Sequence, residues 1–281
     1  MRAIDTLHLG RRRWICCWQV GEVLIDPGPT LSLDTVLDAL DGWRPRAILL
    51  THIHFDHAAG TGELMRRYPD LELYVHELGA PHMVNPERLW ASASRLYGED
   101  NMLALWGEFV PVPAERVHAL SGGERLEIGG GAFDVAYTPG HAKHHVAYLH
   151  QGVAFVGDVG GVRIEPGTPV VPPTPPPDID IEAWHHSIEL VRAWRPECLA
   201  MTHFGPSEEP DAQLDELSAR LDHWAAAARD QDRSEWGAAV EADLRAVVTP
   251  ETYDSFIAAV PLDQAYAGLR RYWEKTAHAR N

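Results

Sequence analysis

Residues 51–57 read Thr-His-Ile-His-Phe-Asp-His, which places three histidines and one aspartate within six positions. Imidazole and carboxylate groups together suit Zn²⁺, and also Fe or Mn. If the chain is extended here, His52 and His54 point to the same side, because side chains alternate along a strand. Asp56 and His57 lie just before a predicted helix and turn in another direction. The spacing therefore favours two adjacent metal ions over one.

Four short apolar segments end at, or a few residues before, a side chain that can bind a metal. They are residues 46–51 before His52, 133–138 before His141, 152–157 before Asp158, and 197–202 before His203. Proteins of the α/β class gather functional groups from distant parts of the chain at such strand ends. We therefore expect His52, His54 and His141 to hold one ion and Asp56, His57 and His203 to hold the other. Asp158 is expected to bridge them, because a carboxylate has one oxygen for each metal.

The elements that must position these residues follow from hydrophobic periodicity and turn signals. The pattern predicts hairpins over 14–26 and 124–138, single strands at 46–51, 71–76, 146–150, 152–158 and 197–202, and helices over 32–41, 58–68 and 181–194. Residues 81–115 are predicted to form a helical insertion or lid. Residues 166–177 contain seven prolines and are expected to be stiff and extended. Three helices are predicted over 211–230, 234–248 and 252–275.

Five motifs together resemble the metallo-β-lactamase fold superfamily of metallohydrolases over roughly residues 4–206. They are Ile25-Asp26-Pro27-Gly28, residues 51–57, Thr138-Pro139-Gly140-His141, Gly157-Asp158 and Thr202-His203. The resemblance implies an α/β fold (α+β), an αββα sandwich of two mixed β-sheets flanked by helices. It also implies the same seven ligands at one sheet edge. Asp26 and His145 are expected to support the metal loops without binding metal. We expect a catalytic domain over 1–206 and a C-terminal helical region, or extension, over 207–281.

The function implied is that of a dinuclear metal-dependent hydrolase, with zinc expected and iron or manganese as alternatives. A metal-bridging hydroxide, oriented by Asp56, would cleave an ester, thioester or lactone carbonyl of a small molecule. The hydroxyacylglutathione hydrolase and lactonase branches both stay open, although Gly161 stands where the lactonase branch has a tyrosine. Trp90 and Trp106 are candidates for a substrate roof. Arg163 is a candidate for binding a substrate carboxylate, with a surface salt bridge as its more common role.

The amino-acid composition limits the classes of molecule that this protein is expected to bind. The chain carries 24 basic and 41 acidic residues, a formal charge of −17, which disfavours nucleic acid and therefore a nuclease. A mononuclear iron enzyme resembling persulfide dioxygenases and a non-catalytic binding protein are two further classes that the sequence permits. No signal peptide or membrane span is predicted, and three cysteines give no disulfide framework, so a cytoplasmic location is expected. The apolar stripe Leu214, Leu217, Leu221 and Trp224 is expected to pack on the main domain or in a homodimer.

Overall fold

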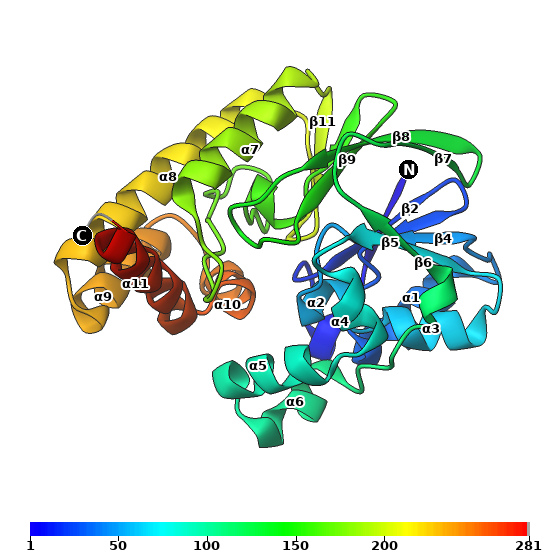
Figure 1. The fold of residues 1–281 in the computed structure, drawn as a ribbon. Helices are drawn as coiled ribbons and strands as arrows, with labels where there is room; N and C mark the ends of the chain where they lie inside the picture. The colour runs from blue at the N-terminus through cyan, green and yellow to red at the C-terminus, as the bar shows by residue number, and fades with distance from the viewer. Residues whose placement is uncertain (280–281) are drawn as a thin grey trace.

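Two six-stranded sheets packed against each other form the centre of the computed structural model, which describes residues 1–279 (Figure 1). The first has the order β1-β2-β3-β4-β5-β6, and the second β12-β11-β10-β9-β8-β7. Both sheets are mixed, because β3 to β6 are parallel while β1 to β3 are antiparallel, and β10-β11 is the parallel pair of the second sheet. Helices cover both outer faces. The predicted αββα sandwich is confirmed.

The strands of the first sheet are β1 Arg2–Asp5, β2 Cys16–Val20, β3 Val23–Ile25, β4 Ala47–Leu49, β5 Glu72–His76 and β6 Val117–Leu120. Those of the second are β7 Arg125–Ile128, β8 Gly131–Tyr137, β9 Val146–His150, β10 Val153–Phe155, β11 Cys198–Met201 and β12 Gly205–Ser207. Buried side chains such as Trp18, Phe133 and Phe155 fill the space between the sheets. The sequence pattern did not predict strands β1, β6 and β12.

The helices beside the first sheet are α1 Leu33–Leu40, α2 Phe55–Ala58, α3 Thr61–Arg67, α4 Ala80–Val84, α5 Glu87–Tyr97 and α6 Glu99–Trp106. The later helices are α7 Ile181–Ala193, α8 Pro210–Asp230, α9 Arg233–Arg245, α10 Pro250–Ala259 and α11 Leu262–Ala279. Two predicted helices are wrong in extent. Residues 58–68 belong to two short helices, and 252–275 is divided at Pro261, whose ring removes an N–H and clashes with the preceding turn.

The C-terminal helices share an apolar cluster with α7 and the outer face of the second sheet. Leu214, Leu217, Leu221 and Trp224 of α8 are all buried in it, together with Trp184 of α7. The predicted stripe therefore packs on the rest of the same chain, while the homodimer stays a prediction. Within residues 1–279, no helix is both long and apolar enough to cross a membrane.

Candidate metal centre

The structure brings all seven predicted ligands together at one edge of the sandwich. His52 follows β4, His54 caps α2, and Asp56 and His57 lie inside that short helix and not before it. The second sheet contributes the other three, His141 after β8, Asp158 in the 3-10 turn after β10, and His203 after β11. Their ligand atoms form two groups, His52, His54, His141 and Asp158, and Asp56, His57 and His203, each within 4.8 Å.

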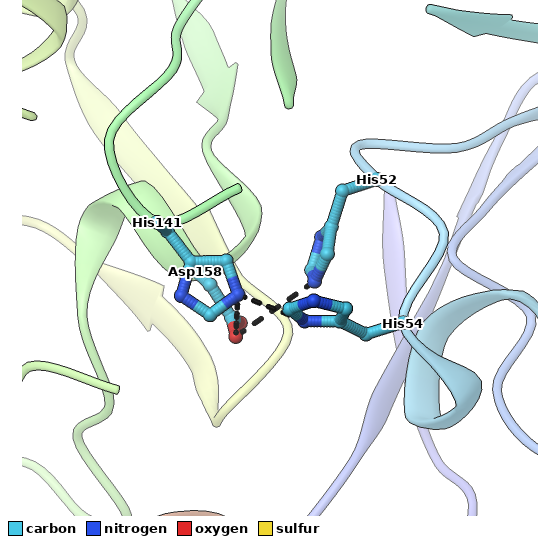
Figure 2. Close-up of side chains that lie close together, drawn as sticks. All are labelled: His52, His54, His141 and Asp158. Atoms are coloured by element: carbon cyan, nitrogen blue, oxygen red, sulfur yellow. Dashed lines mark hydrogen bonds and ion pairs between the residues drawn. The ribbon is translucent and has the colours of Figure 1, made fainter. Parts of the chain in front are cut away.

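Asp158 faces both groups of ligands. Its Oδ2 lies 3.2 Å from His141 Nε2, and its Oδ1 lies 3.2 Å from His57 Nε2. Figure 2 shows the first group converging from separate loops, with His54 Nδ1 3.0 Å from His141 Nε2. Gly157 makes this approach possible, because a Cβ there would lie 2.5 Å from Thr51 Oγ1 and its φ is +46°. One carboxylate therefore stands between two sets of imidazole nitrogens.

The outer ring nitrogens show which atoms are free to bind a metal. His141 Nδ1 donates to Pro173 O at 2.8 Å, His203 Nδ1 donates to Trp14 O, and His57 Nδ1 donates to Asp26 Oδ2 at 2.8 Å. A ring proton on Nδ1 leaves a lone pair on Nε2. The Nε2 atoms of His52, His57 and His203, and Oδ1 of Asp158, are buried without a hydrogen-bond partner within residues 1–279. Such inward-facing, unsatisfied atoms fit a bound cation.

Hydrogen bonds to Asp26 connect the two loops that carry the predicted ligands. Its carboxylate is fully buried and accepts hydrogen bonds from the Thr51 N–H at 2.8 Å and the Thr51 hydroxyl at 2.7 Å. It also accepts one from the Thr202 hydroxyl at 2.8 Å, in addition to the one from His57. The residue thus connects the segment after β4 with the segment after β11, as a supporting group and not as a member of either ligand group.

The electrostatics of the centre keep His52 and His54 neutral, whereas the ionised carboxylates favour a proton on His57. Burial, followed by neighbouring imidazoles, lowers the pKa of His52 well below its usual value and that of His54 to about 4. Burial alone would raise the pKa of Asp158, but His57 and His141 outweigh it and hold that pKa well below its usual range. Burial likewise lowers the pKa of His57, yet Asp158 and Asp26 raise it well above its usual value. A divalent ion would replace this attracted proton.

Two histidines next to the ligands have different surroundings. His145 is buried, with Nδ1 2.8 Å from Thr138 Oγ1 and its ring 5.2 Å from that of His52, so it packs behind a ligand. His144 is half-buried, and its Nδ1 accepts a hydrogen bond from the Ile53 N–H at 3.4 Å. Its ring lies 5.6 Å from that of His54 and lines the cavity above the centre. Sequence reasoning assigned no role to His144.

The sequence pattern of the metallo-beta-lactamase superfamily matches residues 21–203, which include all seven clustered side chains. The chain belongs to the metallo-beta-lactamase superfamily.

Among curated members of the superfamily, the metallo-beta-lactamase fold-containing protein ST1585 of Sulfurisphaera tokodaii is 29% identical over 197 residues, 68% of this chain and 72% of that protein. A hydroxyacylglutathione hydrolase of Xylella fastidiosa is 33% identical over 152 residues, 52% of this chain and 45% of that enzyme. The chain therefore matches less than half the length of the curated hydrolase.

Solved structures of the superfamily show the same fold. The crystal structure of ST1585 from Sulfolobus tokodaii superimposes with a TM-score of 0.72, covering 96% of this chain and 97% of that one at 23% identity. TTHA1623 in a di-iron-bound form gives a TM-score of 0.54 at 26% identity, covering 72% of this chain and 93% of that one.

A cavity of about 830 Å³ opens above the cluster of seven side chains. Its walls come from three distant parts of the chain, namely helices α5 and α6, the proline crossing 173–178, and the segment 257–271 around the α10–α11 junction. Most of its side chains are apolar, including Leu96, Trp106 and Val260. His54, Asp56, His141 and Asp158 form part of the lining. The cavity is therefore continuous with the candidate metal centre.

The predicted substrate residues have different positions relative to this cavity. Trp106 is buried in its wall, whereas Trp90 packs behind the wall with its ring 5.8 Å from that of Phe55. Arg163 does not line the cavity, and its Nη2 is 3.2 Å from Glu216 Oε2. The structure thus gives Arg163 a structural ion pair. Sequence reasoning missed the cavity arginines Arg88, Arg95 and Arg271, because their proximity depends on packing between distant helices.

Proposed function

We propose that this chain is a dinuclear metal-dependent hydrolase that cleaves an ester, thioester or lactone of a small molecule. The supporting observation is the division of seven ligands into two groups with Asp158 between them. Two divalent ions bound there would supply a water of lowered pKa and a Lewis acid for a carbonyl oxygen. Superfamily membership supports the hydrolase class, and a cavity of this size above the ligands supports a small substrate.

Side chains of this protein would orient the attacking water and surround the scissile bond. Asp56 has its Oδ2 3.3 Å from His203 Nε2 and a side chain 20% exposed toward the cavity, so we assign it the role of orienting the attacking water. Burial raises the pKa of this carboxyl, but His57 and His203 lower it below its usual range and keep it ionised. The apolar side chains that line the cavity would reduce the amount of water around the scissile bond and so strengthen the polar interactions there.

The apolar cavity suits an acyl chain. On helix α5, Leu89, Ala93 and Leu96 recur at helical spacing and line the cavity, while no residue of that helix is buried. Ile257 and Val260 line the facing wall. An acyl thioester or ester places an apolar chain beside a reactive carbonyl, and the curated relatives named hydroxyacylglutathione hydrolase support the thioester class.

The test begins with the metal content of protein purified without added metal, measured by elemental analysis. We expect about two ions per chain, zinc foremost, although the di-iron form of TTHA1623 supports iron as the alternative. Hydrolysis of a panel of acyl thioesters, esters, lactones, β-lactams and phosphodiesters is then followed with metal-loaded protein. His57→Ala should abolish turnover while the fold, checked by circular dichroism, persists.

Two results would overturn the proposal. One iron per chain with oxygen consumption on a persulfide substrate would show the mononuclear dioxygenase chemistry. Turnover that is unchanged in His57→Ala would show that the cluster is not the catalytic centre.

A further inference from the structure

The wall of the cavity formed by helix α5 has a basic edge beside its apolar face. Arg88, Ser92 and Arg95 are separated by four and three residues, so their side chains project from one side of the helix. All three line the cavity. Arg88 and Arg95 are seven residues apart, so their Cα atoms are separated by about 10 Å along the helix axis. The same helix therefore offers an apolar stripe and, next to it, two positive charges.

A third arginine reaches the cavity from the opposite wall. Arg271 of α11 lines it, and its Nε donates to Pro177 O at 3.3 Å. That bond holds the guanidinium against the proline crossing and leaves its terminal nitrogens for another acceptor. Two elements far apart in the sequence, α5 and α11, thus present arginines to one space.

These positive charges contrast with the composition of the chain. The protein has a formal charge of −17, yet the acidic side chains that line the cavity are Asp56 and Asp158 of the metal centre and Asp178. Asp178 Oδ1 is 3.2 Å from Lys143 Nζ, so its charge is already balanced. None of the three arginines has an ion-pair partner within residues 1–279. Away from the metal centre, the lining therefore has three arginines against one carboxylate that is already paired, and such an excess of positive charge attracts an anionic ligand.

We propose that Arg88, Arg95 and Arg271 form a subsite for a carboxylate at the end of the substrate remote from the scissile carbonyl. This inference rests on the proposed hydrolase function for the position of that carbonyl. The substrate class is then an acyl ester or thioester with an apolar middle and an anionic end. Guanidinium groups pair with carboxylates in a forked geometry, so three of them select for a charged end over a neutral one.

Binding to the metal-loaded protein tests the subsite without turnover. Calorimetry compares dicarboxylic acids from hexanedioate to dodecanedioate with the monocarboxylic acids and the diacid monomethyl esters of the same chain lengths. At the best chain length we expect the diacid to bind about tenfold more tightly than both. Arg88→Gln, Arg95→Gln and Arg271→Gln should each reduce that advantage severalfold, and Arg88→Lys should retain part of it.

Arg44→Gln is the matched control. Arg44 is exposed and precedes β4, at the end of that strand opposite the metal centre, so its removal changes net charge equally without touching the cavity. Equal affinities for diacid, monoacid and monoester at every length would overturn the subsite. An equal loss in Arg44→Gln would overturn it too, because a long-range charge effect would then account for the preference.

Kinetics separate this inference from the function on which it rests. If the enzyme hydrolyses thioesters with charged and neutral ends at equal kcat/KM, the subsite is wrong and the hydrolase function stands. If no substrate is hydrolysed but the diacid preference disappears in the cavity arginine variants, the subsite stands and the proposed function is wrong.

Discussion

Asp26 is the residue on which the geometry of the centre most depends, since four hydrogen bonds from three residues end on its carboxylate. In Asp26→Asn an NH₂ group replaces one carboxylate oxygen. This group can only donate, so it faces the donors of the neighbouring residues without accepting from them. We expect metal affinity to fall roughly 10- to 100-fold, as is usual when the group behind a ligand is lost. Competition with a chelator measures this.

Asp134→Asn serves as the control for that substitution, because Asp134 pairs with Arg125 on the hairpin β7–β8 and its side chain is 42% exposed. Metal affinity should be unchanged there. Equal affinities in wild type and Asp26→Asn would show that the hydrogen bonds to Asp26 do not hold the ligands in place.

His144 presents a hydrogen-bond donor to the cavity. A backbone N–H can only donate, so the bond from Ile53 leaves the His144 proton on Nε2, which has no protein partner within residues 1–279. Burial, followed by His54, lowers the pKa of His144 well below its usual value and keeps the ring neutral. His144→Phe should retain the metal content of the wild type while kcat/KM falls about tenfold. Loss of metal, or unchanged kinetics, would contradict this role.

His8 makes stability depend on pH at a distance from the ligands. Its ring is buried against Trp106, with centroids 5.5 Å apart, and burial lowers its pKa to about 4. The unfolded chain takes up this proton near pH 6.5. Between about pH 4 and pH 6.5 the unfolded state therefore binds more protons than the folded state. The free energy of unfolding consequently decreases as the pH falls through this range. The Tm advantage of wild type over His8→Asn should shrink from about pH 7 to about pH 4.5.

At the scale of the elements, helix α11 indirectly supports His141, a predicted ligand that lies elsewhere in the chain. Thr174 Oγ1 donates to Ala265 O at 3.2 Å, and a Cβ on Gly268 would lie 2.0 Å from Thr174 O. The neighbouring Pro173 O accepts the Nδ1 proton of His141. Packing between α11 and the proline crossing thus fixes one imidazole of the centre.

Gly268→Ala should therefore destabilise the fold by about 1–3 kcal/mol and weaken metal binding. Gly237→Ala on α9 is the contrasting change, because nothing lies within 4 Å of its added Cβ. It should stabilise the fold by about 0.5–1 kcal/mol, the ordinary gain of alanine over glycine in a helix. Urea unfolding and chelator competition give both quantities. Similar effects of the two substitutions would refute the contact.

How far the sequence determines these elements differs between the metal centre and the cavity. Apolar runs that end in His or Asp predict the strand ends, and the structure brings the side chains at these ends together in two groups. The cavity could not be predicted, because Arg88 and Arg271 meet only when α5 and α11 pack around the same space. Strands such as β12, three residues long, depend on pairing with β11 and carry no periodic signal of their own.

At the scale of the whole molecule, the metal ions would join the two sheets. Each ligand group combines residues that follow β4 of the first sheet with residues that follow strands of the second. Direct links across the sandwich also exist, from Trp18 Nε1 to Met201 O at 3.1 Å and from the Tyr148 hydroxyl to Leu50 O at 2.8 Å. A cation that binds only the folded arrangement stabilises it by mass action.

Removal of metal by a chelator should lower the Tm by roughly 10 °C, from two sites each contributing about 3 kcal/mol at high saturation. Restoring zinc should recover it. In a variant that lacks His57 the shift should be smaller, since one ligand group loses a member. A Tm insensitive to chelation would contradict a cross-link between the sheets, and differential scanning calorimetry measures it.

The contact between α11 and the proline crossing also constrains how this chain can diverge. The superfamily match ends at residue 203, and one of the helices that follow packs against the segment that orients His141. A chimera with its C-terminal helices taken from a relative would disturb metal binding unless residues 166–177 came from the same donor. We therefore expect helix α11 and residues 166–177 to change together among relatives. A relative with a different α11 beside the cavity should also differ in residues 166–177.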